Sequence, residues 1–336
     1  MKIFDRLDTG RLDQSWADRF NPEVSIYNGK EAAFLPAVQA QVSPYGQVAT
    51  GEMPVYAQLH SALLPYEFTG WLDEMKSITD TCYIGDWSWL EKVRISGPDA
   101  VKCLEASSIN NIRNMKTGKA KHFVAVNHDG YITVDGIVFR ESEDTFLVTG
   151  GLTVKAGEGI RTEGMDVTAQ TLTSRIYNFH IQGPHSAKVI EKLCGEDISD
   201  LGFISFRDIV ICGETTRLYR GGMSGELGYE IFGDAAVASV IWKAVVDAGQ
   251  EFGIRQLGYR TLMSNHLQSF FPTIWVDFIP AIMPPEAHLD MFYRTPHDFG
   301  WDNLMDKERD FVGKEAMLKE QAEPTHKTMM LEWNSD

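Results

Sequence analysis

The chain has 336 residues, of which 43% are hydrophobic and 23% charged, and its 31 basic and 47 acidic residues give a formal net charge of −16. This composition is typical of a globular protein of two or three domains and excludes a disordered, collagenous or membrane-spanning chain. The acidic charge argues against nucleic acid and anionic membranes as partners. The N-terminus is too charged for a signal peptide, so we expect a cytoplasmic protein.

The residues that most often bind metals are scattered. Cysteines stand at 82, 103, 194 and 212, with no Cys-x-x-Cys pair, and the histidines form no His-Glu-x-x-His set. We therefore expect no metal site.

In chain order, residues 1–61 have weak periodicity and are predicted to form an irregular N-terminal arm. Two later stretches each predict a strand, a Gly-Pro turn and a helix, around Gly97-Pro98 and Gly183-Pro184. This repetition indicates two similar subdomains, at 62–170 and 171–300, although two such turns can also resemble each other by chance. Residues 301–336 are expected to begin a C-terminal segment that is incomplete.

The remaining elements are intermixed along the chain. After the first Gly-Pro turn, strands are predicted at 122–126, 131–140 and 145–149. After the second, strands are predicted at 208–212, 215–219 and 229–232. A helix is expected over 235–252, capped by Asp234, stopped by Gly253, and apolar along Val237, Val240, Ile241, Ala244 and Val245. Because there is no regular βαβ alternation, the predicted fold class is α+β.

Asp135 is the first candidate for chemistry, since it lies at the centre of an alternating strand. A carboxylate there is costly to bury unless a cation or hydrogen-bond donor meets it. The alternative is a solvated strand face.

Glu230 follows a Gly-rich bend at 221–228, whose glycines allow close backbone approach to a flat ligand. Its carboxylate can accept a bidentate hydrogen bond from an amino-pyrimidinone edge. A plain hairpin turn with an edge-strand Glu is the alternative.

Two basic features complete the candidates. Arg260 can pair with a carboxylate or with a ligand carbonyl, and a surface ion pair is equally compatible with the sequence. A basic run of Arg113, Lys116, Lys119 and Lys121 can receive an anionic tail or form a solvated loop.

These segments together resemble the glycine cleavage T-protein family. Five motifs occur in the family's order, at 127–135, 181–184, 221–231, 258–260 and 310–316. Segments 67–71, 119–121, 251–253 and 264–265 add similarity to tetrahydrofolate-dependent O-demethylases of vanillate or syringate type. The resemblance covers residues 62–336.

The resemblance implies a folate-binding fold of two similar mixed α/β subdomains around a central cavity, with tetrahydrofolate as cofactor. By the same likeness, Asp135 lies beside the reactive nitrogens of the pterin, Glu230 holds its amino edge, and Arg260 lies near the active site. The family's C-terminal strand domain is expected to be absent or incomplete here.

Two departures bear on the reaction. Where the resembled demethylases have a catalytic Tyr this chain has Leu262, and where they have a His it has Trp89. We therefore expect methyl transfer to tetrahydrofolate, giving 5-methyltetrahydrofolate, from a small donor whose leaving group needs little protonation, such as a halomethane or a sulfonium.

Two other functions stay open. One is a methoxy-aromatic O-demethylase that uses a different acid, such as Tyr259, His266 or Tyr66. The other is a folate-binding regulator without turnover. A monomer or homodimer is expected.

Overall fold

The computed structural model describes residues 56–59, 62–151, 162–282, 288–332 and 334. Their contacts divide the chain into two compact units. Unit 1 joins the described residues up to Leu90 with Leu172–Ser269, and unit 2 joins those of Glu91–Thr171 with those of Phe270–Asp336. Most of the expected N-terminal arm lies outside the described residues, but its end at Tyr56–Leu59 is a strand.

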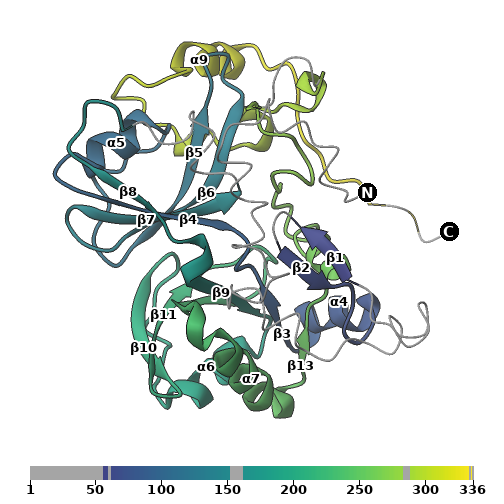
Figure 1. Cartoon of the computed structure of the whole chain (residues 1–336). Coiled ribbons are helices and arrows are strands. Elements are labelled where there is room, and N and C mark those ends of the chain that lie inside the picture. Colours follow the sequence, from purple (N-terminus) through teal and green to yellow (C-terminus); the bar gives the residue numbers. More distant parts are fainter. Residues whose placement is uncertain (1–55, 60–61, 152–161, 283–287, 333, 335–336) are drawn as a thin grey trace, which may run out of the picture. The chain divides into compact units, whose positions relative to one another are not determined.

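Unit 1 is built on a six-stranded sheet (Figure 1) in the order β10-β11-β12-β9-β3-β13. The strands are β3 (Cys82–Asp86), β9 (Ile176–Gln182), β10 (Phe206–Ile211), β11 (Glu214–Arg220), β12 (Gly228–Asp234) and β13 (Ile254–Gln256). All neighbouring strands are antiparallel except β13 and β3. A separate hairpin pairs β1 (Tyr56–Leu59) with β2 (Ala62–Pro65).

The helices of unit 1 are α4 (Trp71–Asp80), α6 (Ser186–Cys194), α7 (Ala238–Gly249) and α8 (Tyr259–Leu262), with short 3₁₀ turns at Thr173–Arg175, Ala235–Val237 and Gln250–Phe252. Buried side chains from the sheet and from α4, α6 and α7 form one hydrophobic core. Parallel pairing within an otherwise antiparallel sheet, together with these helices, confirms a mixed α+β fold.

Unit 2 has a five-stranded antiparallel sheet in the order β5-β6-β7-β4-β8. Its strands are β4 (Glu91–Ser96), β5 (Ala120–Val126), β6 (Ile132–Arg140), β7 (Thr145–Gly151) and β8 (Thr168–Thr171). Its helices are α5 (Ala100–Ala106) and α9 (Lys314–Ala322), with 3₁₀ turns at Asp290–Phe292, His297–Phe299 and Asp302–Leu304.

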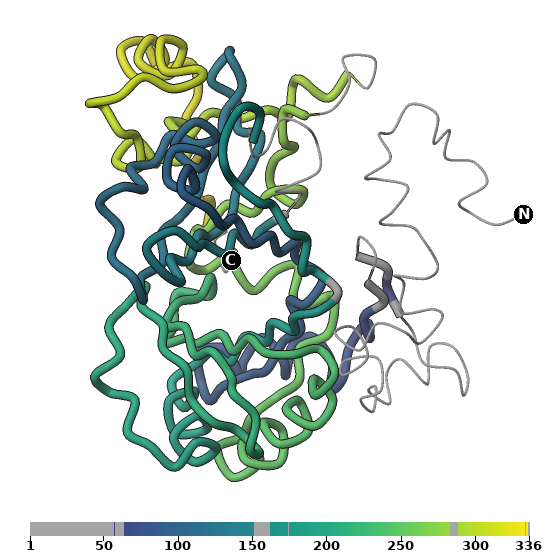
Figure 2. Tube along the Cα trace, turned by 60° about the vertical axis from the view of Figure 1, so that its left-hand side comes forward, coloured from purple at the N-terminus to yellow at the C-terminus, as the bar shows by residue number. Residues whose placement is uncertain are grey.

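Both faces of this second sheet are covered. Along β5, Phe123 and Ala125 enter one apolar cluster, whereas Val124 and Val126 enter another, as the period of two requires. The second cluster is completed from late in the sequence, by Ile274, Phe278, Met305 and Met317. Figure 2 shows the yellow C-terminal helix of this late segment beside the blue hairpin of β5 and β6.

The boundaries of the units differ from the continuous subdomains expected at 62–170 and 171–300. Strand β3 lies between β9 and β13, so the chain before Leu90 belongs with the later sheet. In unit 2, the Ile132 N–H donates to the Arg294 carbonyl over 2.8 Å. Pairing between segments so distant in sequence leaves no local signature.

The two Gly-Pro turns have the same structure. Gly97 has φ 134° and Gly183 has φ 115°, and a Cβ at either glycine would collide with backbone of another segment. Each helix begins two residues after its proline, at Ala100 and Ser186, so the prolines belong to the turns and are not first helical residues.

The expected helix over 235–252 forms as a 3₁₀ turn, α7 and a second 3₁₀ turn. The Asp234 carboxylate accepts from the Ala236 N–H, and Gly253 has φ 75°, so both predicted ends are confirmed. The expected apolar stripe is wrong at one position, because Val240 is 57% exposed and Trp242 packs into the core in its place.

Candidate functional site

Glu230 is a buried carboxylate in the middle of the sheet of unit 1, with 8% of its surface exposed. It lies on β12, opposite His180 on β9 and Tyr219 on β11. Its Oε2 is 3.2 Å from His180 Nε2 and accepts from Asn178 Nδ2 over 3.3 Å. The edge-strand alternative is therefore wrong, because β12 has a partner on both sides.

His180 links Glu230 to a wider polar network. Its ring stacks on Trp87 with centroids 4.0 Å apart and planes 8° apart. Its Nδ1 is 3.2 Å from Gln182 Nε2. The Oε1 of Gln182 accepts from both the N–H and the hydroxyl of Ser224, over 3.2 and 2.7 Å.

The glycines of the bend at 221–228 accommodate the protein's own side chains. A Cβ at Gly222 or Gly228 would collide with Gln182, and one at Gly221 would collide with the Tyr219 ring. The bend thereby brings Ser224 against Gln182. The close packing that we expected against a flat ligand is here packing against these side chains.

Arg260 belongs to the first turn of α8 and makes two contacts within unit 1. Its Nη1 donates to Glu67 Oε1 over 2.9 Å, and its guanidinium lies 4.8 Å from the centroid of the Trp71 ring. Glu67 is buried, whereas the Arg260 side chain is 47% exposed. Of the alternatives that the sequence left open for Arg260, the structure shows the pairing with a carboxylate, that of Glu67.

Glu74 is a residue that the sequence analysis missed. One of its oxygens accepts from the backbone N–H groups of Phe68 and Thr69, and the other from the Gly258 N–H and the Thr261 hydroxyl. The carboxylate thus joins the motif at 67–71 to the motif at 258–260 and fixes the start of α8. Burial raises its pKa above the usual range of a glutamate, although these four donors oppose the shift.

The expected substrate-pocket residues all lie in unit 1. Leu262 and His266 are buried, and Trp89 is half-buried against the hydrophobic core. The Tyr259 ring stacks with that of Tyr66, at 6.2 Å between centroids.

Asp135 lies in unit 2, on β6, and is 8% exposed, so the solvated strand face is wrong. Its Oδ1 is 2.5 Å from Nε2 of His122 on the neighbouring strand β5. The His122 ring meets Trp301 edge-on at 4.6 Å and lies 6.4 Å from the Phe271 ring. The two strands predicted at 122–126 and 131–140 are consecutive, and this is the signal that could have connected His122 with Asp135.

His122 lies on β5, the edge strand of its sheet, and the segment beside this strand fixes its position. The Asn110 side chain donates to the His122 carbonyl and accepts from the Val124 N–H, each over 2.9 Å. The Ile109 N–H donates to the Val124 carbonyl. These bonds take the place of a neighbouring strand beside β5.

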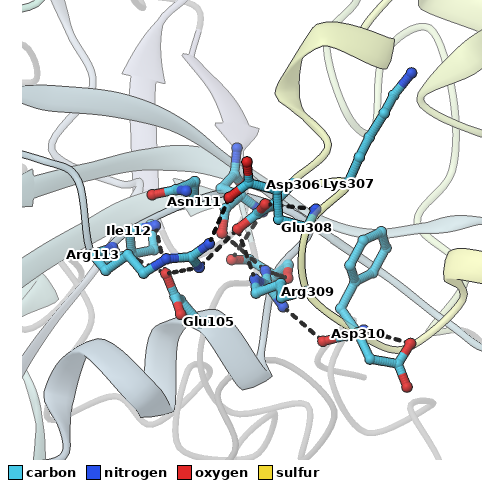
Figure 3. Close-up of polar contacts among 12 residues, drawn as sticks. Glu105, Asn111, Ile112, Arg113, Asp306, Lys307, Glu308, Arg309 and Asp310 are labelled. Carbon is cyan, nitrogen blue, oxygen red and sulfur yellow. Dashed lines mark hydrogen bonds and ion pairs between the residues drawn. The ribbon is translucent and has the colours of Figure 1, made fainter.

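The expected basic run is partly neutralised. Arg113 pairs with Glu105 and Asp306, as Figure 3 shows, and Lys121 Nζ donates to the Asn111 carbonyl. Arg309, half-buried in the same cluster, donates to the carbonyls of Ser108 and Asn110. The cluster joins the late segment of unit 2 to its earlier segment at Glu105–Arg113. Arg113 and Lys121 are therefore engaged by the protein itself.

Neither a transmembrane helix nor a metal cluster is found in the part of the chain that the structure describes. No helix there has the length and apolarity to cross a bilayer. No group of three or more His, Cys, Asp or Glu side chains there is arranged to hold a metal ion.

Comparison with known proteins decides the family. The model of the GCVT N-terminal domain matches residues 36–296. The chain belongs to this family. Glycine cleavage system aminomethyltransferase T from Bartonella henselae has the same fold, with a TM-score of 0.68 and 20% identity over 84% of this chain and 75% of that one.

Two relatives of this GCVT-domain protein are enzymes. Sesamin methylene transferase of Sinomonas sp. (strain No.22) is 31% identical over 303 residues, which are 81% of this chain. Syringate O-demethylase of Sphingobium sp. (strain NBRC 103272 / SYK-6) is 29% identical over 305 residues, which are 78% of this chain. The matches span 67% and 64% of those proteins. The resemblance inferred from the motifs is thereby confirmed.

Proposed function

We propose that this protein transfers a one-carbon unit, as a methyl group, from a small donor to tetrahydrofolate. Members of its family use tetrahydrofolate, and relatives include aminomethyltransferases and a demethylase. The observation that carries the proposal is the buried Glu230 with its polar network. Among the described residues this central-strand carboxylate pairs with an imidazole and an amide rather than with Lys or Arg, and such burial is costly unless the carboxylate serves a ligand.

The residues around Glu230 fit a reduced pterin. The carboxylate offers acceptors to a flat edge of N–H donors. The buried Asn178 Oδ1 is an additional acceptor, with no hydrogen-bond partner among the described residues. Glu230 and Asn178 are therefore the residues that we assign to the amino edge, and Arg260, which lies in the same unit, is assigned to pterin binding.

Asp135 is assigned to the reacting nitrogen. Tetrahydrofolate supplies, when bound, the nitrogen that accepts the one-carbon unit. The Asp135 carboxylate can stabilise positive charge that develops there and accept the proton that is released. His122 holds one carboxylate oxygen, so the other is left for this task.

The character of Leu262 and Trp89 supports a donor whose leaving group needs no acid. Neither side chain can give a proton to a departing oxygen, and Leu262 is buried in the apolar core. A halide or a neutral thioether departs without protonation. We therefore favour a halomethane or a methylsulfonium.

A methoxy-aromatic donor is the second candidate, supported by the similarity to a syringate O-demethylase. It requires an acid other than the residue at 262. Tyr259 and Tyr66, which stack with each other, and the buried His266 are side chains that can supply one.

The test supplies tetrahydrofolate with chloromethane, a methylsulfonium or vanillate in turn, and follows methyl-tetrahydrofolate. We expect turnover with one of the first two donors, and its loss by about a hundredfold or more in Asp135→Asn, as for a lost general base. Turnover of vanillate alone would overturn the donor assignment. Folate binding without turnover of any donor would identify a binding protein, and absence of folate binding would refute the function.

A further inference from the structure

We propose that Ser224, Gln182 and His180 form a one-directional hydrogen-bond relay that holds His180 as the neutral tautomer protonated on Nε2, and so orients Glu230. Gln182 and His180 are thereby positioning residues for the ligand edge that Glu230 holds. The ligand part rests on the proposed function, whereas the tautomer is a property of the protein alone.

The relay begins at a group that can only donate. A backbone N–H has no lone pair, so the Gln182 atom facing the Ser224 N–H is the carbonyl oxygen Oε1. The Ser224 hydroxyl donates to the same oxygen. The Gln182 amide therefore has a single orientation, with its NH₂ group turned to His180.

The second step fixes the imidazole. The Gln182 NH₂ group also only donates, so His180 Nδ1, 3.2 Å away, must accept and carry no proton. A neutral imidazole with a bare Nδ1 carries its proton on Nε2. This Nε2 lies 3.2 Å from Glu230 Oε2.

The surroundings make this arrangement rigid. Trp87 covers one face of the imidazole in a nearly parallel stack, and His180 and Gln182 are both buried. The Gln182 side chain packs directly against Gly222 and Gly228, where a Cβ would collide with it. A proton on His180 Nδ1 would set two donors against each other, so the hydrogen-bond geometry places the ring proton on Nε2.

The tautomer is measured first in the ligand-free protein, by long-range ¹H–¹⁵N NMR of its histidine rings, with His180→Asn to assign the signal. We expect a bare Nδ1 and a protonated Nε2 in the wild type. A proton on Nδ1 would overturn the proposal, whatever the protein binds.

The variant Gln182→Glu reverses the relay, because a carboxylate accepts from Ser224 and can only accept from His180. We expect the His180 proton to move to Nδ1. Ser224→Ala is the matched control for the tautomer, since it keeps the backbone N–H that sets the direction, and His180 should stay protonated on Nε2. An unchanged tautomer in Gln182→Glu would contradict the relay.

Tetrahydrofolate binding by calorimetry tests the positioning role. We expect Gln182→Glu to weaken binding about tenfold or more, the effect of one lost hydrogen bond to a charged group. Gln250→Glu, the same change on an exposed residue, should leave binding unaltered. If the wild type binds no tetrahydrofolate, the proposed function fails and the tautomer result still stands. Equal binding by the wild type and Gln182→Glu would overturn the positioning role.

Discussion

At the scale of single residues, three buried carboxylates differ in what compensates their removal from water. Glu74 receives four hydrogen bonds from the segments it joins. Glu230 faces an imidazole and an amide, and Asp135 faces one imidazole. A carboxylate that is fully bonded by its own chain, as Glu74 is, serves structure, whereas the less compensated Glu230 and Asp135 are the two that we propose to accept hydrogen bonds from a ligand.

Glu74→Ala should destabilise the protein by about 3 kcal/mol, because it leaves several buried donors without an acceptor. Chemical denaturation measures the loss. Glu320→Ala is a suitable control, since among the described residues Glu320 accepts hydrogen bonds from Thr325 alone, near the surface. Equal stability of Glu74→Ala and the wild type would show that water replaces the carboxylate.

Glu74 should also make stability depend on pH. Burial raises its pKa in the folded state, so the folded protein binds more protons than the unfolded chain above the ordinary pKa of about 4.3. Its contribution to stability is therefore complete below that pH and is lost as pH rises through the raised pKa. The free energy of unfolding of the wild type, compared with Glu74→Gln, should fall over this window. A pH-independent difference would contradict the prediction.

At the scale of elements, the two strand–turn–helix stretches depend on glycines that no other residue can replace. Gly97 and Gly183 combine a positive φ with backbone from another segment where a Cβ would lie. Each turn therefore lies in direct contact with another segment of backbone, at Asp166–Val167 for Gly97 and at Thr81–Cys82 for Gly183.

Gly97→Ala and Gly183→Ala should each destabilise the protein by more than about 2 kcal/mol, because strain and collision add. Gly195→Ala separates the two causes: Gly195 has φ 71° and open space around its missing Cβ. Gly195→Ala should lower the free energy of unfolding by about 1 kcal/mol, from backbone strain alone. Thermal unfolding measures all three, and equal losses would show that collision contributes nothing.

At the scale of the whole molecule, each compact unit is assembled from two stretches that are separated in the sequence. In unit 2, the strands come from the earlier stretch, and one face of their sheet is covered by side chains from the later stretch, among them Phe278, Met305 and Met317. The Arg309 cluster at Ser108 and Asn110 fastens this late segment. The support of His122, and through it of Asp135, thus includes residues nearly 200 positions further along.

Phe278→Ala should therefore lower hydrogen-exchange protection in β5 and β6. Removal of a buried Phe costs about 3–5 kcal/mol, and Phe278 packs in the cluster with Val124 and Ile132. Exchange followed by mass spectrometry measures the change. Phe292→Ala, at an exposed position, is the control. Unchanged protection in Phe278→Ala would mean that the late segment does not stabilise the sheet.

Most strands and both Gly-Pro turns were predictable, because alternation, turn residues and helix ends are local features of the sequence. The motifs also identified the family. Individual contacts were harder to predict. On α7, Trp242 rather than Val240 packs into the core, because the sheet beneath the helix decides which of its side chains are buried.

The sequence by itself determined the α+β class, the family and the choice of Asp135, Glu230 and Arg260 as candidates, since these follow from residue types in a fixed local order. Only the tertiary structure decided the partners of Glu230 and Arg260, whereas the partner of Asp135 lies on the neighbouring strand of the same hairpin. His180, Gln182 and Glu74 meet their partners where strands and turns come together across long separations, because hydrogen bonding is settled by distance in space rather than along the chain.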